Sequence, residues 1–274
     1  MLASEIKSKA LDLVLQPAVL SPLPHLTNIN SDDYDKCAAF TAYLKASGIN
    51  IVNCYIPARW AAAKTGLGKF GRNNFIYDPE HGSYIWVEYW VVDKEFAYDA
   101  TPDNIYLSEC GEHCEKCVRA CPTSALSGGF SMDRGKCIAQ LSYFAKELPQ
   151  ESTREQMGLW LYGCDACQDV CPCNADKFKE SETIPQLRQL EECLKLENIL
   201  MLDERTYIRK IHPRFDYIGK DGLWLWKCNA LRAMINAGEK KYHGLIKQCC
   251  GHEDARIREM AQWGCDRLGI VRYA

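Results

Sequence analysis

The spacing of the cysteines constrains this chain more than any other feature. The segment CGEHCEKCVRACP, residues 110–122, places four of the sixteen cysteines of a 274-residue chain close together. A second segment, CDACQDVCP at residues 164–172, repeats the ending C-x2-C-x3-C-P, and Cys137 precedes it. Cysteines at such short spacings either form a disulfide framework or hold a metal group.

Two C-x2-C-x3-C-P runs are typical of bacterial two-cluster ferredoxins, in which the fourth cysteine of each run ligates the other cluster. Three neighbouring thiolates wrap one cube, and the proline after the fourth cysteine ends the loop and directs that thiolate away. The spacing therefore predicts two [4Fe–4S] clusters. The predicted ligands are Cys110, Cys114, Cys117 and Cys171 for the first cluster, and Cys121, Cys137, Cys164 and Cys167 for the second.

Three other interpretations of the cysteines are open. A disulfide framework suits an oxidising compartment, and four cysteines can also bind zinc. The spacing C-x3-C-x2-C of residues 110–117 also occurs in radical S-adenosylmethionine sites, where three thiolates leave one iron open. None of the three explains both matching runs. Cys173 is left over as either an inert thiol or an alternative ligand.

Composition and hydropathy indicate a cytoplasmic protein. The chain is 47% hydrophobic and 25% charged with a net charge of −3, as in ordinary globular proteins. No apolar stretch reaches the roughly 18 residues of a membrane span, and Lys and Asp interrupt the first twenty residues where a signal peptide needs an apolar core. We therefore expect no membrane association and a reducing environment, which disfavours disulfides.

Local patterns predict an α+β protein in three parts. An α/β part over residues 1–108 is expected to contain helices at 31–48 and 57–66, and strands at 49–56 and 84–92. The strand at 84–92 is almost continuously apolar, which suits a strand covered on both faces. A double-cluster, ferredoxin-like domain is predicted over residues 109–180, with helices between Cys137 and Cys164. Helices are predicted over residues 181–274.

The helical part is either a HEAT-like pair of repeats or a simple helical cap on the cluster domain. Apolar residues recur at helical spacing, as at Leu187, Leu190 and Leu194, and Asp254 and Gly269 are suited to begin and end the last helix. Residues 205–274 contain 14 Lys and Arg against 7 Asp and Glu, whereas residues 1–204 contain 19 against 29. A basic helical surface can bind a nucleic-acid backbone or can simply be a solvated face.

Several motifs resemble the epoxyqueuosine reductase family. The segments KTGLGKFGRNNFI, CVRACPTSAL, MDRGKCIAQLSY, GLWLYGCDACQDVCPCN and KCNALRAMINAG occur in the order and rough spacing of that family. The resemblance implies a cobalamin-binding α/β part, a two-cluster part, and a HEAT-like part that contacts the anticodon stem-loop of tRNA. It also implies that electrons from the clusters reduce the cobalt, which then removes the epoxide oxygen of epoxyqueuosine as water.

The resemblance also implies where a corrinoid would bind. The segment GLGKFG and its neighbours make Lys64, Gly66, Gly68, Gly71 and Arg72 the predicted contacts, since glycines let backbone approach a flat macrocycle. The alternative is that these glycines only turn the chain. The catalytic residue stays unknown, because VNCYIP at residues 52–57 lacks the acid that the family carries in the corresponding Asp-Ser-Ala-Pro motif.

Two functions therefore follow from the sequence. The first is a cobalamin-dependent reductase that acts on epoxyqueuosine in tRNA or a related compound and receives electrons from a reduced flavodoxin or ferredoxin. The second is a ferredoxin-like protein that delivers electrons to a separate corrinoid or flavin enzyme. Family members have a longer N-terminal portion, so the resemblance leaves open whether this chain completes a corrinoid pocket.

Overall fold

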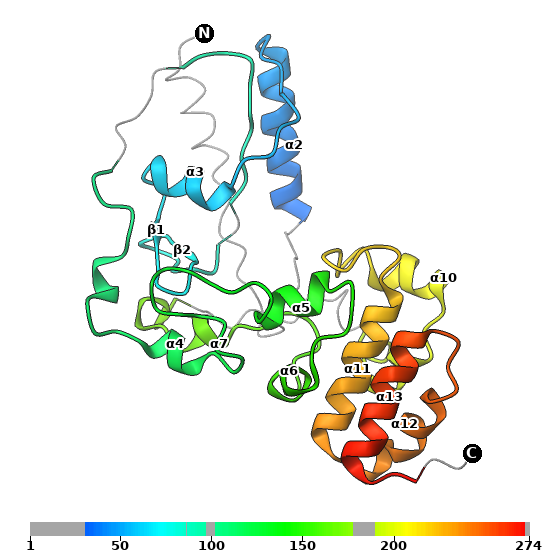
Figure 1. Ribbon diagram of the computed structural model, residues 1–274. Helices are drawn as coiled ribbons and strands as arrows, with labels where there is room; N and C mark the ends of the chain where they lie inside the picture. Colours follow the sequence, from blue (N-terminus) through cyan, green and yellow to red (C-terminus); the bar gives the residue numbers. More distant parts are fainter. Residues whose placement is uncertain (1–30, 86, 97–101, 178–189, 272–274) are drawn as a thin grey trace.

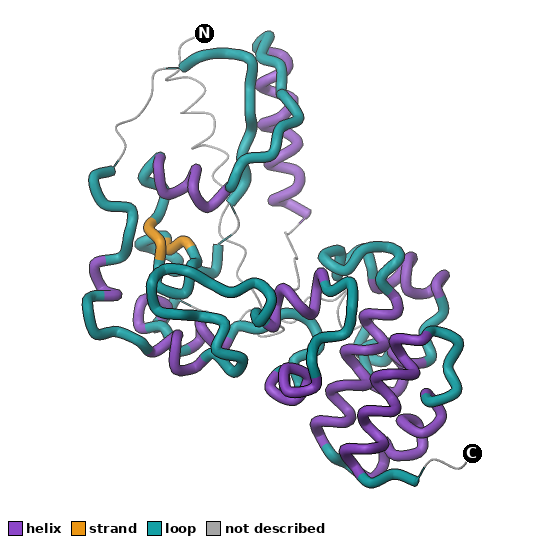
Figure 2. Tube along the Cα trace, viewed as in Figure 1, coloured by secondary structure: helices purple, strands orange, loops and turns teal. Residues whose placement is uncertain are grey.

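The computed structural model of the chain describes residues 31–85, 87–96, 102–177 and 190–271. Short helices and long loops make up most of the described chain (Figures 1 and 2). Within these residues, no helix combines the length and the apolar character needed to cross a membrane. The elements are α2 (Ser31–Ala46), α3 (Ala58–Lys64), β1 (Lys69–Phe70), β2 (Ile76–Tyr77), η1 (Ser108–Cys110), α4 (Lys116–Ala120), α5 (Ile138–Phe144), α6 (Glu151–Gln156), α7 (Ala166–Asp169), η2 (Pro172–Asn174), α9 (Leu196–Leu200), α10 (Glu204–Thr206), the π-helix η3 (Tyr207–Ile211), α11 (Leu223–Ala237), η4 (Lys240–Tyr242), α12 (His243–Cys249) and α13 (Ala255–Leu268).

The two helices predicted before residue 70 are confirmed. Helix α2 is followed by Gly48, whose φ of 69° is a left-handed conformation that glycine adopts without a steric penalty. Helix α3 begins directly after Pro57, and Gly66, with a φ of 75°, follows its end. Phe40 and Leu44 of α2 lie one turn apart and form a small buried cluster with Ile49.

The predictions of strands over residues 49–56 and 84–92 are wrong. In the described residues the two segments pair only at one isolated antiparallel bridge, between Ile51 and Val92, and the described side chains of 84–92 are half-buried or exposed. The regular sheet is instead the antiparallel pair of β1 and β2, with Phe70 opposite Ile76. A segment of strand composition forms a strand only where a neighbouring strand pairs with it along its length. Within the described residues, segment 84–92 pairs with other backbone at that one bridge.

The segment joining β1 to β2 forms a tight hairpin that we call the wedge, residues 69–77. Backbone hydrogen bonds join Gly71 N to Phe75 O at 2.9 Å and Asn74 N to Gly71 O at 2.8 Å. A Cβ atom on Gly68 would lie 2.6 Å from Ile76 Cγ2, so the close packing of the two strands requires glycine there. Phe70 and Ile76 pack with Ala62 and Ala63 of α3, and this packing fixes the wedge on the N-terminal part.

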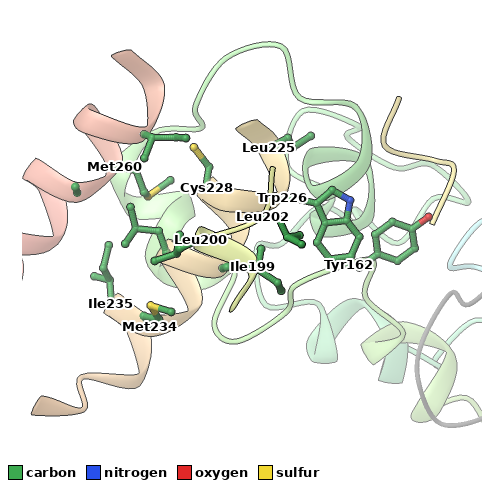
Figure 3. Close-up of a cluster of buried hydrophobic side chains, with 14 of the residues drawn as sticks. Tyr162, Ile199, Leu200, Leu202, Leu225, Trp226, Cys228, Met234, Ile235 and Met260 are labelled. Carbon is green, nitrogen blue, oxygen red and sulfur yellow. The ribbon is translucent and has the colours of Figure 1, made fainter. Parts of the chain in front are cut away.

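The helical C-terminal region has the largest hydrophobic core. Figure 3 shows Trp226, Met234 and Ile235 of α11 among the buried side chains of that core, beside Ile199 and Leu200 of α9. Tyr143 and Tyr162, from the cysteine-rich region, belong to the same cluster. The core therefore crosses from the cysteine-rich region into the helices, and the boundaries predicted at residues 108 and 180 stay predictions. Leu187 lies outside the described residues and Leu190 is buried, but residues 190–194 form turns and the next helix begins at Leu196, so the helix predicted through Leu190 and Leu194 is not found in the described part of the chain.

A polar stripe on α11 binds the segment that leads to Cys164. Its three members, Asn229, Arg232 and Asn236, are spaced three and four positions apart and share one helix face. Arg232 Nη1 donates to Gly158 O at 2.7 Å, and its other terminal nitrogen donates to Trp160 O. The two asparagines donate to further main-chain carbonyls, Asn229 to Ser142 at 3.1 Å and Asn236 to Arg154 at 2.8 Å and Gly158 at 2.9 Å.

The predicted beginning and end of the last helix are confirmed, and they lead to a stability prediction. The Asp254 side chain accepts from Arg256 N at 2.9 Å, and the hydrogen bond from the Arg256 side chain is the main cause that lowers the Asp254 pKa to about 2. Gly269 ends the helix with a φ of 65°. We expect Asp254→Ala to lower the free energy of unfolding by about 1 kcal/mol.

The same cap should depend on pH. Because the carboxyl pKa is lower in the folded state, its stabilisation is present above the unfolded value near 4 and is lost as the pH falls towards 2. Asp254→Asn keeps a capping side chain without the charge, so its stability difference from wild type should shrink between pH 5 and pH 2. Thermal denaturation across that range measures both variants, and a constant difference would contradict the role of the charge.

Candidate metal centre

Four of the predicted ligands line one hollow of about 270 Å³ beside the turn of the wedge. Its cysteines are Cys110, Cys114, Cys117 and Cys171, so three come from the first run and one comes from the second. The wedge supplies part of the wall, because Gly71, Arg72, Asn73 and Tyr77 also line this hollow, with Lys116 and Pro172.

The other four predicted ligands line a second hollow of about 840 Å³. They are Cys121, Cys137, Cys164 and Cys167. The remaining wall is mainly apolar and includes Leu126, Ile138, Tyr143 and Phe144. Helices α4 and α7, which carry Cys117 and Cys167, pack against each other and bring the two hollows close together. The structure thus gathers the eight cysteines in two groups of four, each drawn from both runs.

Burial keeps several of these thiols neutral in the metal-free protein. Desolvation is the largest cause in each case: it raises the pKa of Cys110 and Cys117, and it raises the pKa of Cys164 to about 12. Neighbouring charge opposes ionisation of Cys164 further; it comes first from Asp165 and then from Cys137 and Cys121 once these ionise. A metal group that binds thiolates here must therefore displace protons, and it would in turn compensate the clustered negative charge.

Backbone donors reach sulfurs in both groups. Arg72 N donates to Cys110 Sγ at 3.3 Å, and Ala125 N donates to Cys121 Sγ at 3.2 Å. Hydrogen bonds of this kind favour the thiolate form and tune the reduction potential of a bound cluster. The Arg72 guanidinium donates to Gly128 O at 2.9 Å and to Gly111 O at 2.5 Å, which ties the beginning of the first run to the segment that follows the run.

A buried polar network attaches the second run to the segment that follows the wedge. Ser83 N donates to Asn174 Oδ1 at 2.9 Å, and Asn174 Nδ2 donates to Gln168 O at 2.9 Å. Ser83 Oγ donates to Gln168 Oε1 at 2.8 Å. A Cβ on Gly82 would lie 2.3 Å from Asn174 Oδ1, and its φ of 65° also favours glycine. The position of Cys171 between Gln168 and Asn174 is therefore fixed by residues far away in sequence.

Comparison with known proteins agrees with this arrangement. Residues 109–174 match the 4Fe-4S double cluster binding domain, so the chain contains a domain for two such clusters. An epoxyqueuosine reductase from Bacillus subtilis is 31% identical over 221 residues, which cover 79% of this chain and 54% of that protein. The chain belongs to the epoxyqueuosine reductase family. It spans about half the length of the curated reductases that it matches.

Two further comparisons cover most of this chain. A solved epoxyqueuosine reductase, crystallised with an epoxyqueuosine-modified tRNA-Tyr stem loop, matches with a TM-score of 0.69 and 26% identity. The match covers 86% of this chain and 62% of that reductase. An uncharacterized protein from Geobacillus stearothermophilus is 34% identical, over 69% of this chain and 85% of its own length. The shared fold thus includes most of this member of the epoxyqueuosine reductase family.

The glycines that the resemblance assigns to a corrinoid have packing roles in this family member. Gly66 turns the chain after α3, and Gly68 lets β1 approach β2. A Cβ on Gly71 would lie 2.4 Å from Tyr77 Cε2. The Arg72 guanidinium is bound to Gly111 and Gly128, and Lys64 lies 5.6 Å from the centre of the Trp60 ring. Contact of these five residues with a corrinoid stays a prediction.

An aromatic hollow of about 660 Å³ lies next to this segment. Tyr55, Trp60 and Tyr89 line it, and Tyr55 and Trp60 are 85% and 49% exposed. Arg59 borders both this hollow and the second cysteine hollow. None of the five predicted corrinoid contacts lines it. Sequence reasoning missed the hollow, although the Tyr and Trp residues flanking a proline-initiated helix were a usable signal.

Sequence reasoning also missed the polar groups that position the cysteines. Asn73, Tyr77, Ser83 and Asn174 act across long sequence separations, and no local pattern marks them. The exception is the stripe on α11, because Asn and Arg at spacings of three and four within an apolar helix were visible in KCNALRAMINAG. Cys173, left over in the sequence, lies close enough to interact with the Cys171 side chain.

Proposed function

We propose that this chain is an iron–sulfur reductase that holds two [4Fe–4S] clusters with crossed ligands. Cys110, Cys114, Cys117 and Cys171 would bind the first cluster, and Cys121, Cys137, Cys164 and Cys167 the second. One observation carries the proposal: each cysteine hollow combines cysteines from both runs, as crossover ligation requires. A zinc ion binds four ligands, and a pair of zinc sites would not require each run to supply a cysteine to the other run's site.

The chain's own residues prepare the hollows for clusters. When bound, such clusters store and pass single electrons. Cys110 and Cys117 are buried from water, and the amide donors of Arg72 and Ala125 favour negative charge on Cys110 and Cys121. The wedge and the Ser83 network hold the ligand loops in place, so little rearrangement accompanies a change of charge.

We further propose that a corrinoid binds against the aromatic hollow and that the substrate is epoxyqueuosine in tRNA or a related compound. Support comes from the exposed rings of Tyr55 and Trp60, which offer an apolar face beside the second cysteine hollow. Reduction of the epoxide is the chemistry that a bound cobalamin supplies in the family. Lys64 would lie at the edge of this face, while Gly66, Gly68, Gly71 and Arg72 would support it by shaping the wedge.

Anaerobic purification followed by iron, sulfide and cobalt analysis tests this function. About eight irons per chain, a visible spectrum that changes on adding cobalamin, and conversion of epoxyqueuosine in a tRNA stem-loop would support the reductase. Tyr55→Ala with Trp60→Ala should weaken cobalamin binding while the iron content stays at wild-type level. About four irons or fewer would refute the assignment of two clusters.

Electron transfer to a separate corrinoid or flavin enzyme is the second candidate. It is favoured by one observation: the five residues predicted to touch a corrinoid lie outside the aromatic hollow. About eight irons without any cobalamin affinity would select this function. In that case a reduced flavodoxin or ferredoxin would serve as the donor, and the acceptor protein would bind near Arg59.

If tRNA is the substrate, its affinity should fall steeply with salt. Arg209 and Lys210 of η3 are exposed and belong to the basic C-terminal region. Each phosphate contact releases counterions, so Arg209→Glu should reduce the slope of log affinity against log salt by about one. Filter binding of a tRNA stem-loop between 50 and 200 mM salt measures the slope, with Lys69→Glu in β1 as the charge-matched control. Equal slopes for the two variants would remove η3 from the RNA interface.

A further inference from the structure

Among the described residues, Asn73 alone lines both cysteine hollows. It sits at the tip of the wedge, where the hairpin reaches between the two cysteine runs, and only 3% of it is exposed. A polar side chain this deeply buried needs partners for all of its hydrogen-bonding groups. The hydrogen-bond partners of Asn73 show how the wedge connects the two cysteine hollows.

The Asn73 side chain forms hydrogen bonds to residues that line each of the two hollows. Its Nδ2 donates to Tyr77 Oη at 2.8 Å and to Cys167 O at 3.1 Å, which uses both amide hydrogens. Its Oδ1 accepts from Phe75 N at 3.3 Å, which fixes the orientation of the amide. The amide nitrogen therefore lies beside a ligand loop of the second hollow while it holds a hydroxyl that belongs to the first.

Tyr77 extends this contact into the first hollow. It is 3% exposed and lines that hollow together with Cys171. Its hydroxyl accepts from Asn73 at 2.8 Å, which leaves its own proton to donate, and the side chains of Cys171 and Ser83 are both hydrogen-bonding neighbours of this hydroxyl. A thiolate accepts such a proton, so the contacts run from Cys171 through Tyr77 and Asn73 to Cys167.

Gly71 preserves the space for this pair of side chains. A Cβ at that position would lie 2.4 Å from Tyr77 Cε2 and 2.9 Å from Asn73 Oδ1. Contacts under 3 Å cannot be accommodated, so any other residue would push the two side chains apart. Gly71, which the resemblance assigned to a cofactor, thus keeps open the space that Tyr77 and Asn73 occupy.

We propose that Tyr77 and Asn73 are positioning residues that form a hydrogen-bonded link between the two clusters and set the difference between their reduction potentials. The inference rests on the proposed cluster ligands. A hydrogen bond donated to a cysteine sulfur stabilises the more negative, reduced cluster and therefore raises its potential. The Tyr77 hydroxyl acts in this way on the first cluster, and the Asn73 amide acts through the Cys167 loop on the second.

Redox titration followed by electron paramagnetic resonance tests the link in the cluster-loaded protein. Tyr77→Phe should make reduction of the first cluster about tenfold less favourable, a fall of about 59 mV for one electron, and should leave the second nearly unchanged. Asn73→Leu should lower the potential of the second cluster. Variants that lack Cys114 or Cys137 assign each midpoint to its cluster.

Tyr242→Phe is the matched control, because Tyr242 is buried in the helical region away from both hollows. Unchanged midpoints in Tyr77→Phe, with about eight irons retained, would overturn the link. If Asn73→Leu loads fewer irons, Tyr77→Phe alone decides, because it removes one hydroxyl and keeps the ring. Wild-type protein that binds only one cluster would instead refute the ligand assignment, so the two failures are distinguishable.

Discussion

Replacement of Cys171 by alanine is expected to remove the first cluster, although Cys171 belongs to the second cysteine run. It lines the hollow of Cys110, Cys114 and Cys117, whereas the other cysteines of its own run line the second hollow. Iron should fall from about eight to about four per chain, and the remaining spectrum should be that of a single [4Fe–4S] cluster.

Two further variants sharpen this test. Cys173 interacts with the Cys171 side chain, so Cys171→Ala with Cys173→Ala excludes replacement of one thiol by the other. Cys173→Ala alone is the matched control and should keep about eight irons. Cys167→Ala should remove the second cluster. If Cys171→Ala and Cys167→Ala abolished the same spectral component, the crossed ligation would be wrong.

Arg232→Ala is expected to lower the free energy of unfolding by about 3 kcal/mol, the largest stability change that we predict. Only 1% of Arg232 is exposed, and desolvation by burial lowers its pKa to about 10. Its guanidinium donates to the carbonyls of Gly158 and Trp160. Alanine would leave both carbonyls without these donors and would open a cavity in the core.

Chemical denaturation of the cluster-loaded protein measures this loss. Arg209→Ala is the matched control, because Arg209 is exposed on η3 and should change stability by less than about 0.5 kcal/mol. The Gly158–Trp160 segment leads to Cys164, so Arg232→Ala should also release iron from the second cluster faster. A destabilisation of less than about 1 kcal/mol would show that the stripe on α11 contributes little.

Local patterns predicted the helices well and the sheet poorly. Helices α2, α3 and α13 are confirmed because helical spacing and their flanking residues, Gly48, Pro57 and Asp254, act over a few positions. Helices α5 and α6 confirm the prediction of helices between Cys137 and Cys164, and the residues between and after the two helices form turns and loops. Residues 84–92 have strand composition, but pairing depends on distant backbone that composition does not specify.

The candidate site, like the fold, could be predicted from local spacing only in part. The spacing of the cysteines predicted two groups of four, and the hollows contain those groups. The spacing could not reveal the wedge, because Arg72 and Asn73 reach the cysteine loops from residues far earlier in the chain. Asn73 and Tyr77 look like ordinary turn and strand residues in the sequence, and only their burial between the two hollows gives them a role.

The wedge also constrains the order in which the protein can mature. Residues 69–83 leave the ribosome before any of the eight cysteines, and in the folded protein they contact both runs. The first hollow, however, is completed only when Cys171 has been synthesised and held beside Asn174. Cluster insertion therefore belongs after translation of the whole cysteine-rich region, and a nascent chain stopped before that point would expose thiols that iron cannot yet protect from oxidation.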